Sequence, residues 1–390
     1  MKVRKITVCG GGNGAQTLVP IAVNNLGCKV DIYVPFGDEA NRLQAGVDNQ
    51  GGITVTGAVQ VKAKPHRISN NPAEVIPGSD VVVLVIPAFA HESTLRQIIP
   101  FLDSGAYVGA IPSRGGFGYC ATQVLREGKR NDIDLFGVQT LPWACRIRKY
   151  GELVHVLGVK KVVDAAAKPA SKIKQIAPLL ERMLGLSVDA SSSLLALTLA
   201  NTGQLIHPGI MYGLFAGWDG SQLRASEVPF FYHGLSEEGA QTLGDMSDEI
   251  QLIRARLESA LDLSTVRTLI TWLLRSYGDA ISDQSSLWRA FTSNRAYDGL
   301  KAPMREVEPG KFVPDFQARY LTEDVPFGLV VSRAIADLSG VETPTMDKVI
   351  AWAGDRLGKD YLGQDFEEAR VPQKYGLYNI EALIALEMDV

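Results

Sequence analysis

The sequence predicts a Rossmann-type α/β domain followed by an all-α domain. The chain has 390 residues, which is long for one ordinary core and comfortable for two. Its first half alternates strand-like and helix-like segments, and long helical patterns fill the second half. A glycine-rich turn directly follows the first predicted strand. We therefore expect a dinucleotide-binding domain over residues 1–190 and a helical domain over residues 191–390.

The strand candidates of the first half are short apolar runs, as expected when helices cover both faces of a parallel sheet. They are Lys5–Cys9, Lys29–Val34, Asp80–Ile86, Tyr107–Ile111, Leu135–Val138 and Val154–Val159. Ile53–Ala63 alternates like a hairpin and indicates an insertion. The alternation predicts a doubly wound sheet. The helical segments between the strands are Ala15–Leu26, Ala40–Ala45, Ser93–Leu102 and Tyr119–Arg126.

From Ser191 onward the sequence shows helical periodicity and almost no strand pattern. An apolar stripe at three- and four-residue spacing is typical of an amphipathic helix. Its members are Leu243, Met246, Ile250, Ile253, Leu257 and Leu261. Similar patterns cover Thr265–Tyr277, Leu287–Asn294, Phe327–Leu338, Met346–Leu357 and Ile380–Leu386.

The stretch from Ala190 to Trp218 contains no Asp, Glu, Lys or Arg and is long enough to cross a bilayer. It also holds Asn201, Gln204 and His207, and polar groups inside a membrane are costly. We interpret it as a buried helix.

Composition narrows the functional class. Apolar residues make up 46% of the chain and charged residues 21%, as in ordinary globular proteins. The net charge of −4 argues against a protein that binds nucleic acid or an anionic membrane.

The four cysteines are far apart in the sequence and have neither CxxC nor metal-site spacing. We expect them to be buried, reduced thiols of a cytoplasmic protein, with no metal site. The basic N-terminus leads into a strand and a glycine turn, so we expect no export signal.

The segment Ile6–Ala15 has the pattern of a strand, a glycine turn and a helix start, and it fits G-x-G-x-x-A. The first glycine permits the tight turn, the second lets the backbone approach a pyrophosphate, and the alanine lets the helix pack on the strand. The helix N-terminus offers N–H donors to phosphate. The pattern predicts a bound dinucleotide; the alternative is a glycine turn without a ligand. The candidate residues are Gly10, Gly12, Asn13, Gly14 and Ala15.

Asp38 is the candidate that selects NAD over NADP. It follows the second predicted strand, where an acid can accept hydrogen bonds from the adenosine ribose and repel a 2′-phosphate. Its alternative role is that of N-cap for the stretch Glu39–Leu43. Arg42 could in turn serve a phosphate. We expect NAD.

Several segments, taken in their order along the chain, together resemble the opine dehydrogenases of the octopine dehydrogenase type. The resemblance covers nearly the whole chain. They are Gly10–Ala15, Pro87–Glu92, Thr140–Ile147, His207-Pro208 and Arg319–Asp324. The resemblance implies that pyruvate or another 2-oxo acid forms an imine with the amino group of an amino acid or taurine, and that NADH reduces this imine. It also implies a monomer and a role in regenerating NAD during anaerobic glycolysis.

His207 is the candidate catalytic group, because an imidazole can donate and accept protons near neutral pH. It shares one broad helix face with Asn201 and Gln204, and Pro208 should kink that helix. The resemblance supplies Asp324 as its partner, which would fix the tautomer and favour the protonated ring. The alternatives are a buried histidine bonded to a carbonyl group and a helix N-cap role for Asp324.

The resemblance makes Arg319 the residue that binds the substrate carboxylate, since a guanidinium group binds paired oxygens well. The alternative is a surface ion pair with a neighbour such as Asp315. We expect the reaction in a cleft between the domains, with the cofactor bound first to the sheet domain.

Further candidates follow other predicted strands, at the edge of the sheet where ligands lie. Pro87, Ala88 and His91 are cofactor-side candidates, although His91 could instead cap a helix. The resemblance puts Thr140 and Trp143 near the substrate, although Trp143 could be a core residue.

Two departures from octopine-forming enzymes bear on the substrate. Those enzymes carry a glutamate at the position of Gln139 and a glutamine at that of Arg114. A desolvated guanidinium substrate needs a carboxylate partner, which Gln139 does not supply, and Arg114 would repel it. We therefore expect an enzyme of the tauropine, strombine or alanopine type, unless Arg114 points to solvent or to the cofactor phosphates.

Two other classes remain open on the residues alone. Glycerol-3-phosphate, 3-hydroxy acid and ketopantoate dehydrogenases also pair a dinucleotide domain with a helical one, but they generally use a catalytic lysine, and we find none in a comparable context. The other class is a dinucleotide-sensing module without catalysis, against which the retained His207, Asp324 and Arg319 argue.

Overall fold

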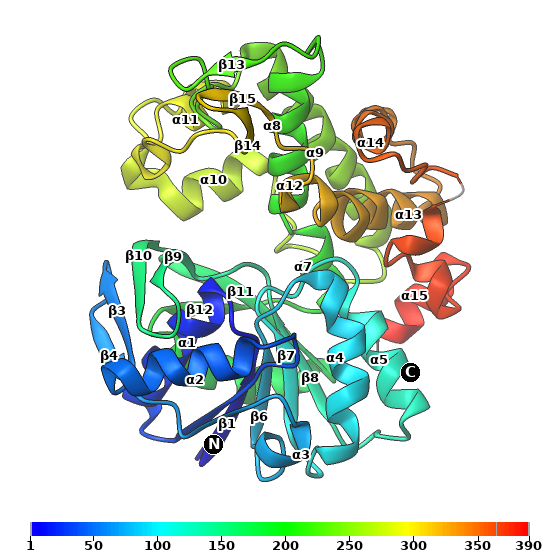
Figure 1. Ribbon diagram of the computed structural model, residues 1–390. Coiled ribbons are helices and arrows are strands. Elements are labelled where there is room, and N and C mark those ends of the chain that lie inside the picture. The colour runs from blue at the N-terminus through cyan, green and yellow to red at the C-terminus, as the bar shows by residue number, and fades with distance from the viewer. Residues whose placement is uncertain (1, 364, 389–390) are drawn as a thin grey trace. The chain divides into compact units, whose positions relative to one another are not determined.

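Figure 1 shows the computed structural model, which describes residues 2–363 and 365–388. These residues form two compact units. The first runs to Thr198 and takes in the chain from Ala385 onward, and the second is Leu199–Ile384. The boundary near residue 190 stays a prediction from the sequence.

The first unit is built on an eight-stranded sheet of order β12-β11-β8-β7-β6-β1-β2-β5. Strands β8 and β11 run antiparallel, and the other neighbours run parallel. This is the doubly wound sheet that the sequence predicts. The strands are β1 (Lys5–Cys9), β2 (Lys29–Tyr33), β5 (Arg67–Ser69), β6 (Val81–Leu84), β7 (Tyr107–Ala110), β8 (Asp134–Val138), β11 (Val162–Lys168) and β12 (Ser187–Ala190).

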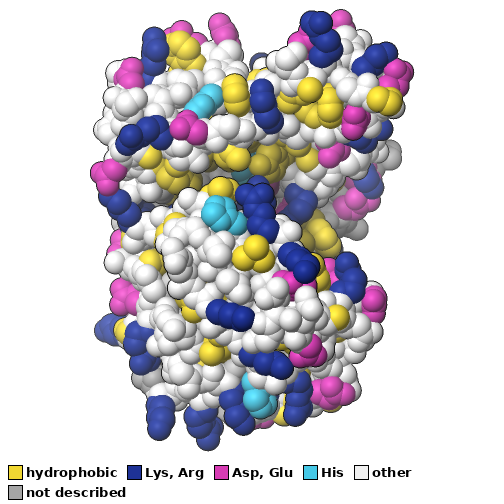
Figure 2. All heavy atoms as spheres, turned by 60° about the vertical axis from the view of Figure 1, so that its left-hand side comes forward, with side chains coloured by type: hydrophobic (Ala, Val, Ile, Leu, Met, Phe, Trp, Pro, Cys, Tyr) yellow, Lys and Arg dark blue, Asp and Glu magenta, His cyan; other side chains and the backbone are white. Residues whose placement is uncertain are grey.

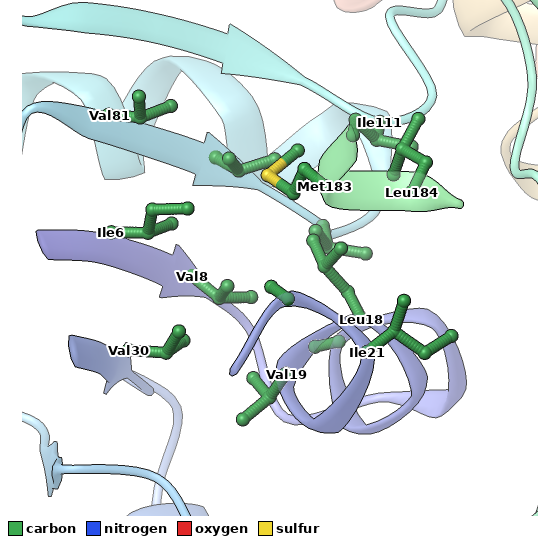
Figure 3. Close-up of a cluster of buried hydrophobic side chains, with 14 of the residues drawn as sticks. Ile6, Val8, Leu18, Val19, Ile21, Val30, Val81, Ile111, Met183 and Leu184 are labelled. Carbon is green, nitrogen blue, oxygen red and sulfur yellow. The ribbon is translucent and has the colours of Figure 1, made fainter. Parts of the chain in front are cut away.

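Helices cover both faces of this sheet (Figure 1). On one face, Ile6 and Val8 of β1 pack with Leu18 of α1 and with side chains of α6, as Figure 3 shows. On the other face, Cys9 shares a core with Leu95 of α4 and with side chains of α5. Successive side chains of β1 thus enter opposite layers, as the pleat of a strand requires. The helices are α1 (Asn13–Leu26), α4 (His91–Ile98), α5 (Phe117–Glu127) and α6 (Ile173–Leu184), and α2 (Glu39–Gln50) follows β2.

A second, four-stranded sheet of order β4-β3-β10-β9 belongs to the same unit. The predicted hairpin at Ile53–Ala63 forms its strands β3 and β4. The predicted strand Val154–Val159 lies here rather than in the parallel sheet, paired with β3 and with β9. Strand β9 was not predicted, because the charged residues of its sequence WACRIRK hide the alternation of its apolar residues. The strands are β3 (Ile53–Gly57), β4 (Val61–Ala63), β9 (Trp143–Lys149) and β10 (Leu153–Val159).

The second unit is mainly helical, as the sequence predicts. One correction concerns strands: β13, β15 and β14 form a small antiparallel sheet in the part expected to be all-α. A turn at Pro309-Gly310 joins β14 to β15. Strand β14 is rich in charge and β15 has only four residues, so neither gives a clear strand pattern. The elements are α8 (Gly203–Phe215), α9 (Glu237–Leu257), α10 (Leu269–Tyr277), α11 (Leu287–Thr292), α12 (Arg319–Thr322), α13 (Val330–Ser339), α14 (Pro344–Leu357), β13 (Leu223–Arg224), β14 (Met304–Glu308) and β15 (Lys311–Pro314). Helix α15 (Ile380–Glu387) begins in this unit and ends in the first.

The charge-free stretch forms two helices rather than one. α7 (Leu194–Leu199) ends before Asn201, and α8 begins at Gly203. Asn201 therefore precedes α8 instead of sharing a helix face with Gln204 and His207. No helix in the described ranges is long and apolar enough to span a membrane.

Charged side chains of both signs lie on the surface (Figure 2), and the cysteines form no disulfide bond. Figure 2 shows acidic and basic side chains both present on the face it displays. All four cysteines are free thiols, and Cys9, Cys120 and Cys145 are buried as predicted. The prediction is wrong for Cys28, which is only half-buried because it lies in the short connection between α1 and β2. Burial raises the pKa of Cys9.

Candidate active site

His207 lies on α8, and its imidazole pairs with a carboxylate from a distant segment. Nδ1 of His207 is 2.8 Å from Oδ2 of Asp324. Asp324 stands at the start of the π-helical turn η6 (Val325–Leu329) and makes no side-chain capping bond there. The Asp324 side chain is 3% exposed and the His207 side chain 17%. Because a carboxylate accepts hydrogen bonds, Nδ1–H is engaged. Proton exchange between Nε2 and a substrate stays a prediction.

A close backbone approach holds α8 against η6. A Cβ on Gly328 would lie 2.5 Å from Cβ of Gln204, a separation that real Cβ contacts do not show. Nε2 of Gln204 also donates to Oγ of Ser332 on α13, at 3.0 Å. Glycine at position 328 therefore lets the two segments meet, and His207 follows Gln204 by three residues on the same helix.

Aromatic side chains surround the imidazole. The ring of Tyr320 stacks on it with a centroid distance of 4.2 Å and an interplanar angle of 17°. Phe231 lies 6.2 Å away, and Oη of Tyr232 is 3.5 Å from Nε2 of His207. The Tyr232 ring stacks on that of Tyr297 at 3.8 Å, which restricts its movement. Burial above all raises the pKa of Tyr297, so this phenol stays neutral.

Arg319 pairs with Glu323 rather than with Asp315. Its Nε lies 2.5 Å from Oε2 of Glu323, and its Nη2 contacts the same oxygen. The Arg319 side chain is 62% exposed, whereas Glu323 is 3% exposed. Nη1 of Arg319 makes no hydrogen bond with any residue that the structure describes. The exposed guanidinium group is therefore open to an anion, and its role in binding a substrate carboxylate stays a prediction.

The glycine turn of the first unit fits a dinucleotide pyrophosphate. Gly10 has a φ of +127°, and its N–H donates to the carbonyl oxygen of Tyr33 at 2.8 Å. A Cβ on Gly12 would meet no atom within 4 Å, so the backbone there faces open space. Gly12 caps α1 without a side-chain bond, which leaves the first N–H groups of α1 to a ligand or to water. Gly14 and Ala15 follow in the first turn of α1.

Hydrogen bonds connect the β9–β10 hairpin of the second sheet to the glycine turn and the start of α1. Gln16 is fully buried; its Nε2 donates to the carbonyl oxygen of Gly11 at 2.8 Å, and its Oε1 accepts from N–H of Gly151 at 3.0 Å. Oδ1 of Asn13, a predicted cofactor contact, accepts from N–H of Ile147 at 2.7 Å. Strand β9 and the β9–β10 turn therefore both hydrogen-bond to side chains at the start of α1.

The residues after β6 lie at the predicted edge of the sheet. Pro87 is half-buried, and Ala88 is buried in a 3₁₀ turn. His91 is fully buried at the start of α4, with Nε2 3.2 Å from the carbonyl oxygen of Ile86 and its ring edge-on to Phe117. A carbonyl oxygen can only accept, so His91 Nε2–H donates and stabilises this turn. Contact of these residues with the cofactor stays a prediction.

The candidate substrate residues of the first unit follow neighbouring strands. N–H of Ser113 after β7 donates to the carbonyl oxygen of Val138 in β8 at 2.8 Å, and the next residues are the half-buried Arg114 and the buried Gln139. The two predicted specificity residues are therefore brought near one another.

The other two substrate candidates, Thr140 and Trp143, follow β8 in the chain. Thr140 is half-buried. Trp143 is 2% exposed and belongs to the core around β1 and α1, in agreement with its alternative as a core residue.

Asp38 is exposed at the N-cap position of α2, where its side chain makes no capping bond. Its Oδ1 accepts instead from Nδ2 of Asn41 at 2.7 Å. Among residues 2–363 and 365–388, no group of three or more His, Cys, Asp or Glu is placed to hold a metal ion.

The sequence analysis missed Tyr232, Glu323 and Gln16. Tyr232 comes from a segment without helical or strand periodicity, 25 residues after His207, and carries no pattern of its own. Glu323 did have a signal, since it follows Arg319 by four residues, the spacing of a helical ion pair.

Comparison with known proteins identifies the family. Residues 190–357 match the family model described as NAD/NADP octopine/nopaline dehydrogenase, alpha-helical domain. The opine dehydrogenase of Haliotis discus hannai is 37% identical over 408 residues, covering 98% of this chain and 99% of the relative. The chain belongs to the opine dehydrogenase family. Tauropine dehydrogenase of Arabella iricolor is also similar, 34% identical over 397 residues with 97% and 99% of the two chains covered.

Solved opine dehydrogenase structures agree with this assignment. An octopine dehydrogenase with NADH and L-arginine superposes with a TM-score of 0.87 at 33% identity, covering 98% of both chains. The predicted fold class is confirmed. That solved structure holds NADH, the cofactor that the sequence predicts for this chain.

Proposed function

We propose that this opine dehydrogenase condenses pyruvate with a small amine that carries its own anion and reduces the resulting imine. Taurine, glycine, alanine and β-alanine are such amines, and the product from each is its N-(1-carboxyethyl) derivative. The His207–Asp324 contact of 2.8 Å, in a chain of this family, is the observation that carries the proposal. Pyruvate is bound with NADH in a solved octopine dehydrogenase of TM-score 0.85 and 32% identity. The reaction would regenerate NAD during anaerobic glycolysis.

The residues of the second unit supply the proton. Bound NADH supplies the hydride to the imine carbon. Protonated His207 gives the proton on Nε2 to the imine nitrogen, so that C=N becomes CH–NH; in the reverse direction neutral Nε2 takes that proton back. Asp324 keeps Nδ1 protonated and orients the ring. Arg319, exposed and adjacent to Tyr320, binds the carboxylate of the 2-oxo acid.

The residues after β7 and β8 support the choice of amine. Gln139 is 3% exposed and neutral, so it gives no counter-ion to a desolvated guanidinium group. Arg114 follows Ser113, which bonds to the end of β8, and adds a second cation that favours a small amine carrying its own anion.

A spectrophotometric assay tests the proposal. NADH absorbance is followed with pyruvate and one amine at a time: taurine, glycine, L-alanine, β-alanine and L-arginine. We expect NADH oxidation only when both substrates are present, with a higher kcat/KM for at least one of the small amines than for L-arginine.

Two results would contradict it. L-arginine as the best amine would overturn the substrate class while leaving the reaction intact. NADH binding without oxidation for every pair would instead favour the module that senses a dinucleotide.

A further inference from the structure

Two polar groups beside the glycine turn have no partner within the described chain. Oη of Tyr150, from the β9–β10 turn, is buried and forms no hydrogen bond. The carboxylate of Glu39, in the first turn of α2, makes no hydrogen bond or ion pair with a described residue. Buried polar atoms are rarely left unpaired, so such a group points to a ligand or to water.

Both groups meet at the same glycine. An ideal Cβ on Gly11 would lie 2.6 Å from Oη of Tyr150 and 3.3 Å from Oε2 of Glu39. Gly11 follows β1 and stands between Gly10, which bonds to the end of β2, and Gly12, whose backbone faces open space. A hydroxyl donor and a carboxylate acceptor therefore flank the turn on the β2 side.

In sheets of this kind the adenosine half of a dinucleotide extends past the end of β2, starting from a pyrophosphate at the glycine turn. Its ribose presents two adjacent hydroxyl groups, each of which donates and accepts. A carboxylate accepts from such a diol, and a neutral phenol hydroxyl can donate to it. Burial and the nearby Glu39 raise the pKa of Tyr150 to about 12, so its hydroxyl keeps its proton at neutral pH.

Arg42 completes the arrangement. Its guanidinium carbon lies 5.0 Å from the centre of the Tyr150 ring, and no ion pair holds it in the described chain. A 2′-phosphate arriving here would meet this cation but also the Glu39 carboxylate, which would repel it. Asp38, by contrast, is exposed and bonded to Asn41.

We infer that Glu39, rather than the adjacent Asp38, is the acid that binds the adenosine ribose and selects NADH over NADPH, with Tyr150 as its hydroxyl partner. This inference deepens the proposed function and rests on its use of NADH. It assigns specificity to one side chain of α2 and leaves the imine chemistry untouched.

An equilibrium titration of the full chain with NADH, and a second one with NADPH, tests the inference. Nucleotide fluorescence reports the binding, and no substrate is present. We expect the unaltered protein to prefer NADH. Glu39→Gln should weaken NADH binding about ten- to a hundredfold, because a bond to a charged acceptor is lost. Glu39→Gln should also reduce the ratio of NADH affinity to NADPH affinity, since no carboxylate then repels a 2′-phosphate that Arg42 attracts. Adding Arg42→Ala to this variant should weaken NADPH binding again.

Asp38→Asn removes the same charge one residue earlier, and Asp48→Asn removes a charge from an exposed ion pair farther along α2. Both should change NADH affinity less than about twofold. Tyr150→Phe should weaken NADH binding by about three- to tenfold, the loss of one neutral hydrogen bond. Thermal unfolding of each variant checks that the fold is kept, and Glu39→Asp, which keeps the charge but shortens the reach, should bind NADH with intermediate affinity.

An unchanged NADH affinity in Glu39→Gln, or an equal loss in Asp38→Asn, would overturn the inference. Because no 2-oxo acid or amine is present, these titrations are independent of the reaction. A chain with the expected nucleotide preferences that forms no opine would contradict the proposed function alone.

Discussion

Nδ1 of His207 lies 2.8 Å from Oδ2 of Asp324, although 117 positions separate them in the chain. The acid is buried and the ring is partly open, so the pair presents one nitrogen outward while the other is held in place. The contact depends on α8 meeting η6, which the missing side chain of Gly328 permits.

His207→Gln should lower kcat by about 10²- to 10⁴-fold, the usual contribution of a positioned general acid or base. NADH affinity should stay within about twofold, because the glycine turn belongs to the other unit. Steady-state rates and a fluorescence titration measure the two quantities. Full turnover in this variant would exclude His207 as the proton donor.

The two directions of the reaction should have different pH optima. Reduction uses the protonated ring of His207, so its rate should fall as pH rises; oxidation uses the neutral ring, so its rate should fall as pH drops. Asp324→Asn replaces the carboxylate acceptor of Nδ1–H with a neutral amide that orients the ring less firmly, so the rates of both directions should fall. Rates of both directions across a pH series check this, and coincident optima would contradict the shared ionisation.

Tyr232→Phe should lower kcat by about three- to tenfold, because it removes a hydroxyl 3.5 Å from Nε2 of His207 and leaves the stacked ring in place. Tyr212→Phe is the matched control, since Tyr212 lies on α8 with His207 but packs edge-on against Trp352. Equal effects of the two changes would show that the hydroxyl of Tyr232 has no special part in the reaction. The comparison needs only kcat and KM for both variants.

Gly328→Ala should destabilise the fold by about 1–3 kcal/mol, because the new methyl group has no room beside Gln204. It should also reduce kcat, since α8 carries His207. Gly244→Ala on α9 is the control: a Cβ there meets nothing within 4 Å, and stability should stay or rise slightly. Thermal unfolding and steady-state rates measure the two effects. An unchanged melting temperature for Gly328→Ala would show that α8 and η6 do not need this close contact.

The double change Gln139→Glu and Arg114→Gln should raise kcat/KM for L-arginine relative to taurine by at least about tenfold. It supplies a carboxylate for the guanidinium group and removes a like charge. Initial rates with both amines measure the ratio. A ratio that does not move would place amine selection in other residues.

The sequence was sufficient for features that depend on local patterns. The alternation of apolar runs and helices predicted the parallel sheet, and the spacing of Gly10, Gly12 and Ala15 predicted the turn. The resemblance to a family supplied Asp324 for His207, which no spacing could have indicated across 117 positions.

Features that depend on tertiary packing were missed or misplaced. The strand at Val154–Val159 pairs with β3, about a hundred residues earlier, and nothing in its own sequence distinguishes that partner from the parallel sheet. β9 was missed because its charges hide a half-buried alternation. The break near Asn201 was missed because the stretch without charged residues continues across it.

Gln16 has a consequence for transplanting this strand–turn–helix to another scaffold. Both ends of its buried amide are engaged, one on Gly11 and the other on Gly151. A graft taken from residues 5–26 alone would leave that amide facing a foreign surface, with one hydrogen bond lost. In this chain the glycine turn therefore does not keep its hydrogen bonds by itself, and the smallest segment that could be transplanted with them intact includes the β9–β10 hairpin.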